Sequence, residues 1–182
     1  IFVLLYLYQT IYMLVGLFCK PKRFTAKKQH RYGVLISARN ESAVIAHLIE
    51  SIRNQNYPSE LVDVFVVADN CTDDTADAAR AAGAIVFERF NQEEKGKGYA
   101  LNYLLGRIKQ QYGPEYYEGF FIFDADNVLE KDYITQMNTV FDNGYALVTS
   151  YRNSKNYSDN WITSGYGLWF LREARYLNNA RM

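Results

Sequence analysis

Two carboxylates separated by a single residue are the most distinctive chemical feature of this sequence. Asp124, Ala125 and Asp126 end an apolar run that begins at residue 119. Side chains at positions i and i+2 of an extended chain point to the same side, so Asp124 and Asp126 would repel each other without a cation. Mg²⁺ and Mn²⁺ bind one or two carboxylates and complete their shells with water and phosphate oxygens. The pair therefore indicates a divalent-metal site, with a solvated turn as the alternative.

A lysine between two glycines, Gly96-Lys97-Gly98, is a candidate phosphate contact. Its ammonium group is a compact charge, and glycines let backbone N–H groups approach an anion closely. The segment is not the nucleotide-binding loop GxxxxGK[ST], because Asn91 stands at the first glycine position and Gly98 at the Ser/Thr position. A flexible surface loop is the alternative interpretation.

Polar residues also follow two other apolar runs. Asp69 comes directly after residues 64–68, where its carboxylate is a candidate acceptor for the imide N–H of a uracil. Residues 72–74 (Thr-Asp-Asp) suit the start of a helix through capping and the helix dipole, and are predicted to be structural. Residues 37–41 (Ser-Ala-Arg-Asn-Glu) follow the first run, with Asn40 as the expected N-cap of the next helix.

The two histidines are not candidate site residues. Neither His30 nor His47 has a partner at ligand spacing in the sequence, so neither is predicted to hold a metal or to act in catalysis.

The elements that must position these residues alternate between strands and helices. Short apolar runs predict buried strands, and apolar residues three to four positions apart predict helices. Their spacing of about 30 residues is typical of βαβ units and a mostly parallel sheet, in which ligands bind beyond the carboxyl ends of the strands. All four motifs lie at that edge or in a loop that reaches it. The expected strands are 32–37, 64–68, 84–88, 119–124 and 145–151, and the expected helices are 41–53, 73–82, 99–111, 132–142 and 161–178.

The first 19 residues are apolar and carry no charge, and residues 20–31 then hold six basic side chains and no acidic one. Nineteen helical residues span about 28 Å, close to the ~30 Å hydrocarbon core of a bilayer. We therefore expect a transmembrane helix over 1–19 and a basic juxtamembrane collar over 20–31, on the cytoplasmic side. A cleaved signal peptide, which would place basic residues before the apolar run, and a buried core helix are the alternatives.

Composition excludes several classes of protein. Residues 32–182 hold 14 basic and 20 acidic side chains, which argues against a nucleic-acid partner. A hydrophobic content of 49% argues against intrinsic disorder. Two cysteines without a CxxC spacing are too few for a disulfide-dense secreted scaffold and suggest no zinc site.

Taken in order, the four motifs resemble those of the family 2 glycosyltransferases with the GT-A fold. They are most similar to the membrane-embedded group that includes cellulose, hyaluronan and poly-N-acetylglucosamine synthases, and the resemblance covers about residues 32–151. It implies an α/β, Rossmann-like sheet flanked by helices, and a nucleotide-diphospho-sugar donor that is usually UDP-linked. It also implies a Mg²⁺ or Mn²⁺ ion, transfer with inversion at the anomeric carbon, and a saccharide or lipid-linked acceptor at the membrane.

The resemblance assigns a role to each motif. Asp69 matches a carboxylate that recognises the base, although Ala68 replaces the other member of the usual Asp-Asp pair. Lys97 matches a lysine near the nucleotide and its diphosphate. Asp124 and Asp126 match the catalytic metal-binding pair, with Asp126 the better candidate for direct coordination. The residues that match the region beside the uridine are Ala38, Asn40 and Glu41.

The family's general base lies in a Thr-Glu-Asp type motif that this sequence does not contain. Asp159 and Glu173 are the only carboxylates after Asp142, and neither stands in such a context. We therefore expect residues 32–182 to be the donor-binding N-terminal portion of a longer cytoplasmic domain of a membrane enzyme. The alternatives are a non-catalytic, membrane-tethered nucleotide-sugar-binding module and a sugar-phosphate nucleotidyltransferase, which would need a glycine-rich loop that residues 37–41 lack.

Overall fold

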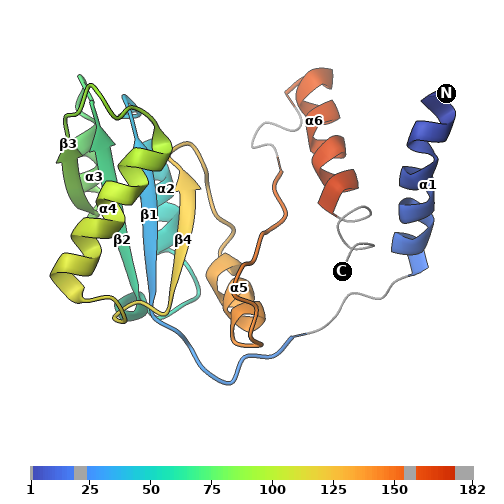
Figure 1. Ribbon diagram of the computed structural model, residues 1–182, viewed down its shortest axis with the longest axis horizontal. Helices are drawn as coiled ribbons and strands as arrows, with labels where there is room; N and C mark the ends of the chain where they lie inside the picture. Colours follow the sequence, from blue (N-terminus) through green and yellow to red (C-terminus); the bar gives the residue numbers. More distant parts are fainter. Residues whose placement is uncertain (1, 19–23, 154–158, 175–182) are drawn as a thin grey trace. The chain divides into compact units, whose positions relative to one another are not determined.

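The computed structural model describes residues 2–18, 24–153 and 159–174 of the 182-residue chain (Figure 1). The chain falls into two compact units. Residues 26–144 form one unit, and the described parts of 1–25 and 145–182 form the other. Every site residue predicted from the sequence lies in the 26–144 unit, which is therefore the one that concerns function.

A four-stranded parallel sheet forms the centre of the 26–144 unit (Figure 1). The chain moves outward from β1 through β2 to β3 and then returns to the other side of β1 as β4, so the strand order reverses between β1 and β4. The four strands predicted within this unit are confirmed, with ends that differ by at most two residues. In the order in which they lie in the sheet, they are β3 (Ile85–Arg89), β2 (Val62–Asp69), β1 (Tyr32–Ala38) and β4 (Gly119–Asp124).

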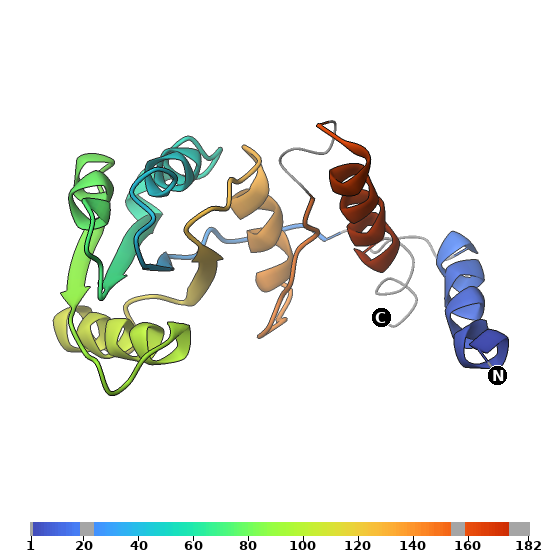
Figure 2. The same cartoon turned by 90° about the horizontal axis from the view of Figure 1, so that it is seen from above.

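The two central strands, β1 and β2, are apolar along most of their length because helices cover both faces of the sheet. Figure 2 shows α4 (Lys97–Tyr112) on one face and α2 (Ile45–Arg53) and α3 (Thr75–Ala81) on the other. Successive side chains of a strand point to opposite faces. Leu35 accordingly packs in the cluster beneath α4, and Ile36 packs in the cluster beneath α2. Both side chains are fully buried.

The helices α2 and α4 each bury an apolar stripe at helical spacing, which is why the sequence pattern predicts them. Their ends differ more than those of the strands. α2 begins at Ile45, because residues 42–44 form a turn, and α4 begins at Lys97, two residues earlier than predicted. α5 (Tyr133–Phe141) lies within its predicted range. The buried residues of α2 and α4 are Ile45, Leu48, Ile49 and Ile52, and Ala100, Leu104 and Ile108, respectively.

The prediction of a fifth strand over 145–151 is wrong. Residues 145–153 contain neither a strand nor a helix. A strand is stabilised by hydrogen bonds to a neighbouring strand, and this segment is paired with none among the described residues. Most of its apolar side chains are exposed, with Leu147 at 88% of its full accessible area.

The second unit contains α1 (Phe2–Phe18) and α6 (Trp161–Leu171). α1 corresponds to the apolar leader, whose predicted ends Ile1 and Cys19 lie outside the described residues, as do residues 20–23 of the collar. No helix in the described part of the chain is both long and apolar enough to cross a membrane. α6 corresponds to the last predicted helix, of which residues 175–178 lie outside the described part.

Candidate functional site

All four parallel strands end at one edge of the sheet, and three of them end in or beside the predicted motifs. β1 ends at Ala38, β2 at Asp69 and β4 at Asp124. The strand register pairs Ala38 with Ala68 on one side of β1 and Ser37 with Asp124 on the other. The fold therefore brings residues from three separate motifs to the edge where α/β sheets bind ligands.

Lys97 and Asp124 meet in an ion pair at this edge. The Nζ atom of Lys97 contacts Oδ1 of Asp124, although the two residues are 27 positions apart in the sequence. Lys97 is the first residue of α4, and the residue before it, Gly96, has a φ of +116° that an L side chain rarely adopts. The glycine therefore shapes the entry into α4, and the helix start presents the lysine to the end of β4.

The turn after β4 is held by Asn127. Its backbone N–H donates to the carbonyl oxygen of Asp124 at 3.0 Å, and its side-chain amide donates to Oδ1 of Asp126 at 3.2 Å. Ala125 is buried between the two aspartates, whereas both aspartates are exposed. Asn127 was not singled out from the sequence as a site residue.

The carboxylates of Asp124 and Asp126 fit a Mg²⁺ or Mn²⁺ ion in the type and number of their donor groups. Among the described residues, no group of three or more His, Cys, Asp or Glu side chains is placed to enclose a metal ion. A site of this kind suits a divalent cation that takes one or two carboxylates and receives its other ligands from water and a bound phosphate. The exposure of both carboxylates leaves room for such ligands.

Asp69 is held by an arginine that the sequence analysis did not identify. Nη1 of Arg89 donates to Oδ1 of Asp69 at 2.7 Å, and these two residues end neighbouring strands in register. Both side chains are almost fully buried, at 7% and 5% of their accessible area. The hydrogen bond to Asp69 raises the pKa of Arg89, against the lowering effect of burial. The only sequence signal was a basic residue at the end of an apolar strand.

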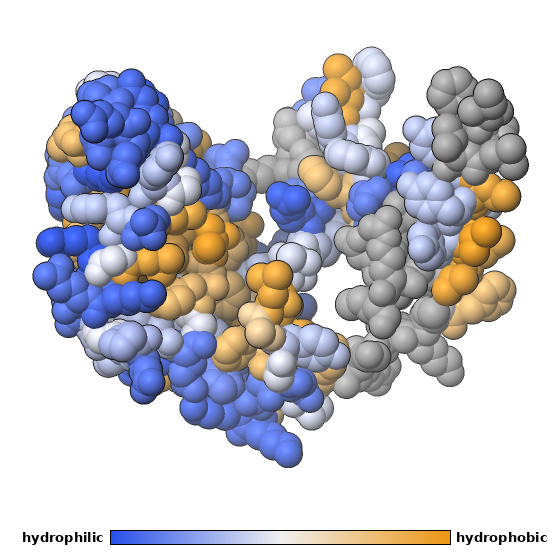
Figure 3. Space-filling view, in the orientation of Figure 1, coloured by the Kyte–Doolittle hydropathy of each residue, from blue (hydrophilic) through white to orange (hydrophobic). Residues whose placement is uncertain are grey.

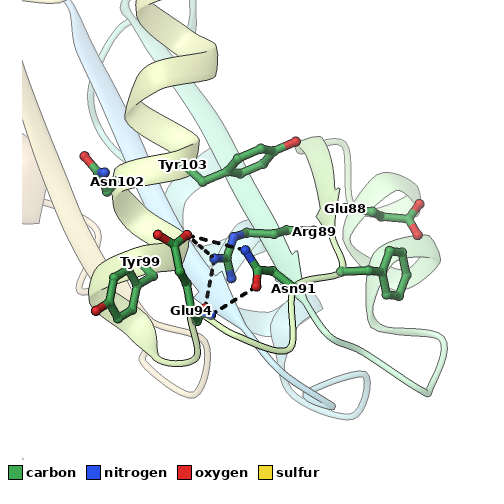
Figure 4. Close-up of a pocket in the computed structure, with 8 residues that line it drawn as sticks. Glu88, Arg89, Asn91, Glu94, Tyr99, Asn102 and Tyr103 are labelled. Atoms are coloured by element: carbon green, nitrogen blue, oxygen red, sulfur yellow. Dashed lines mark hydrogen bonds and ion pairs between the residues drawn. The ribbon is translucent and has the colours of Figure 1, made fainter.

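Arg89 also forms the inner wall of a cavity of about 410 Å³ between the end of β3, the loop 90–96 and the start of α4 (Figure 4). In Figure 4 the Arg89 side chain points toward Glu94 and Asn91, and Tyr103 lies above it on α4. The cavity adjoins Asp69 through Arg89, and neither Asp124 nor Asp126 lines it. Its lining residues are Glu88, Arg89, Phe90, Asn91, Glu94, Tyr99, Asn102 and Tyr103.

Asn40 and Glu41 join the end of β1 to the start of α3. Oδ1 of Asn40 accepts from the backbone N–H of Thr72 at 2.8 Å, and the N–H of Glu41 donates to Oγ1 of Thr75, also at 2.8 Å. Asn40 therefore does not cap α2, which begins four residues after Glu41, and that prediction is wrong. With a φ of +55°, Asn40 makes a sharp turn at the strand end, and its side chain reaches across to α3.

Asp73 has the structural role expected of it. Its carboxylate accepts from the backbone N–H of Thr75 at 3.1 Å and from that of Ser42 at 3.2 Å. Hydrogen bonds from Thr75 and then Ser42 lower the pKa of Asp73 to about 2. Asp73 is therefore a fixed negative charge at the start of α3, and it ties the turn after β1 to that helix.

The chain is similar in sequence to known glycosyltransferases. Over 178 residues the chain is 27% identical to a beta-monoglucosyldiacylglycerol synthase of Nostoc sp., which covers 90% of this chain and 36% of that protein. Over 70 residues it is 41% identical to the 4,4'-diaponeurosporenoate glycosyltransferase of Staphylococcus aureus, which covers 38% of this chain and 18% of that protein. The chain therefore spans about a third or less of the length of these curated relatives.

The fold is similar to that of a solved mannosyltransferase, PcManGT from Pyrobaculum calidifontis, determined in complex with GDP-Man and Mn²⁺. The TM-score is 0.56 at 22% sequence identity, and the match covers 83% of this chain and 41% of that one. The structure thus has the GT-A-like architecture expected from the sequence. The model of the family described as glycosyltransferase like family 2 matches residues 30–181. Because that match takes in the whole sheet and every predicted site residue, the chain belongs to this family.

Proposed function

We propose that this chain binds the nucleotide-diphospho-sugar donor of a membrane-associated, inverting glycosyltransferase. The observation that carries the proposal is the meeting of Lys97 with Asp124 at the point of strand-order reversal, with Asp126 in the same turn. A cation site and a phosphate-binding ammonium group then lie side by side, which is what a diphosphate needs. A divalent ion bound there would neutralise charge on the departing nucleoside diphosphate.

In this proposal, different residues bind the two ends of the nucleotide. Asp124 and Asp126 would hold the ion, and Lys97 would bind the diphosphate. Asp69 would accept the N–H of the base. The main chain around Ala38 and Asn40 would lie beside the nucleoside, since it ends the strand between Asp69 and Asp124.

The printed names of the relatives support a lipid acceptor. One relative is named for a glucosyldiacylglycerol and the other for diaponeurosporenoate, and both of these molecules are lipids. The resemblance allows either a polysaccharide or a glycolipid as the product, and we propose the glycolipid. Incubating the intact protein with radiolabelled UDP-sugars and lipid extracts would show transfer into the organic phase, whereas label only in a water-soluble polymer would contradict the proposal.

Metal-dependent nucleotide binding is the direct test of the site. We expect Mn²⁺ to strengthen UDP binding to the intact protein in calorimetry, and Asp126→Ala to abolish that strengthening because a metal ligand is lost. Glu130→Ala is the matched control, since it removes an exposed carboxylate four residues away. Equal enhancement by Mn²⁺ in both variants would contradict the metal assignment, and a parallel titration with GDP tests the choice of base.

We further propose that the N-terminal segment attaches the protein to the cell membrane and leaves the 26–144 unit in the cytoplasm. The proposal is supported by exposed apolar side chains on α1, which Figure 3 shows in orange, and by the basic collar that follows. The intact protein should stay with membranes after carbonate washing, and a variant without residues 1–25 should be released more readily. Equal release of both would contradict the proposed role of this segment.

A further inference from the structure

Arg89 contacts two parts of the candidate site that belong to separate sequence motifs: Asp69 at the end of β2 and the loop before Lys97. Nη1 of its guanidinium group donates to the carboxylate of Asp69, and Nη2 donates to the carbonyl oxygen of Glu94 at 2.9 Å. Nη2 also lies 3.3 Å from the Glu94 carboxylate. Glu94 is three residues before Lys97, so one planar side chain bridges the base end and the diphosphate end of the site.

A second set of bonds holds the same loop to the end of β2. The side-chain oxygen of Asn70 accepts from the backbone N–H of Asn91 at 3.0 Å, and its amide donates to the Asn91 carbonyl at 3.0 Å. The side-chain oxygen of Asn91 then accepts from the backbone N–H groups of Glu93 and Glu94. Asn70 has a φ of +53°, which aims its side chain back at the loop. The loop before Lys97 is thus fixed at both ends of its turn.

The burial of the Arg89–Asp69 ion pair indicates what the pair does. A buried ion pair is weak support for stability, because well-packed apolar residues often do as well. Its charges must be held in good geometry, however, and a forked guanidinium group fixes direction as well as distance. With Oδ1 of Asp69 bound by Arg89 and by Asn70, the carboxylate has one orientation, and Oδ2 is the oxygen that a base N–H would use.

We propose that Arg89 is a positioning residue that couples the two ends of the nucleotide site. It sets the orientation of Asp69 and, through Glu94, the position of Lys97 at the start of α4. This inference rests on the proposed function and deepens it, because it assigns a role to a residue that contacts neither the base nor the phosphates. Recognition of the base by Asp69 and binding of the diphosphate by Lys97 are then energetically coupled.

Arg89→Lys is the sharpest substitution, because it keeps a positive charge beside buried Asp69 but cannot reach Asp69 and the Glu94 carbonyl with one planar fork. Without nucleotide, hydrogen exchange of the amides in residues 91–97 should become faster in this variant. Arg80→Lys is the matched control, since Arg80 also bridges two carboxylates, Asp77 and Glu88, but on the exposed side of α3. Unchanged exchange in Arg89→Lys would overturn the inference.

With UDP and Mn²⁺, we expect Arg89→Lys to weaken binding by about 10- to 100-fold, as the loss of one hydrogen bond to a charged group does. The same substitution should cost much less in a Lys97→Ala background, because the lysine that it positions is already gone. Equal losses in both backgrounds would mean a general structural effect and would overturn the coupling. Failure of the unsubstituted protein to bind either UDP or GDP would instead contradict the proposed function itself.

Discussion

At the scale of single residues, Lys97 and Asp124 form a contact that a ligand can replace at low cost. Their side chains are 45% and 62% exposed. Exposed ion pairs contribute only about 0–1 kcal/mol to stability. In the proposed site, an incoming diphosphate would therefore take the ammonium group while a divalent cation would take the carboxylate. The ion pair would keep each partner close to that position when no donor is bound.

Lys97→Ala should weaken UDP binding without weakening the fold. Losing a hydrogen bond to a charged group costs about 1.5–3 kcal/mol, so we expect a loss of affinity of about 10- to 100-fold. Lys109→Ala, near the end of the same helix, is the control and should leave UDP affinity unchanged. Calorimetry of both variants measures the effect. An identical affinity in the Lys97→Ala variant would show that its ammonium group does not bind the diphosphate.

At the scale of elements, β1 is the strand on which the site depends. It is paired on both sides, and Ile36 at its centre is fully buried beneath α2. Ile36→Ala should destabilise the protein by about 2–5 kcal/mol, because it leaves a cavity in a packed core. Ile122→Ala on β4 is the control, since Ile122 is 54% exposed, and should change stability by no more than about 0.5 kcal/mol. Urea denaturation of the two variants compares them directly.

The strands, and the edge of the sheet at which the four motifs lie, could be predicted from the sequence because their signals are local. An apolar run such as residues 64–68 identifies a strand wherever its neighbours lie. Arg89 could not be assigned in the same way, because its partner depends on the register between β2 and β3. The prediction of a strand over 145–151 is wrong for a related reason. The local pattern is present there, but among the described residues no neighbouring strand pairs with the segment.

His30 shows the same limit. Its two ring nitrogens each lie 2.8 Å from a carboxylate, at Glu118 and Asp142, which are 88 and 112 residues away in the sequence. The prediction that His30 has no metal or catalytic role stays a prediction. The structure adds that His30 joins the segment before β1 to the start of β4 and the end of α5.

At the scale of the whole 26–144 unit, this junction predicts how stability changes in acid. Hydrogen bonding to Lys28, and then to His30, lowers the pKa of Glu118 from 4.5 to about 2. Since the folded pKa lies below the unfolded one, Glu118 stabilises the fold above about pH 4.5, and this contribution is lost as the pH falls toward 2. Asp142, whose pKa is lowered chiefly by the backbone N–H of Lys27, adds to the same trend.

The melting temperature should therefore fall between pH 4.5 and pH 2, and Glu118→Gln should flatten that fall because it removes the titrating group. Glu115→Gln is the matched control, as Glu115 is an exposed carboxylate three residues earlier. Thermal unfolding followed by circular dichroism over this pH range makes the comparison. A Glu118→Gln profile as steep as that of the control would show that the junction does not govern acid stability.

The outermost strand, β4, has a consequence for how the protein associates. Among the described residues β4 pairs only with β1, and Figure 1 shows it at the end of the sheet. Phe120 and Ile122 on one face are 38% and 54% exposed, and Figure 3 shows apolar side chains over this strand. An open, apolar strand edge is a template on which another strand can add. Asp124 of the proposed metal-binding pair ends this strand, so a strand that added here would lie next to the proposed donor site.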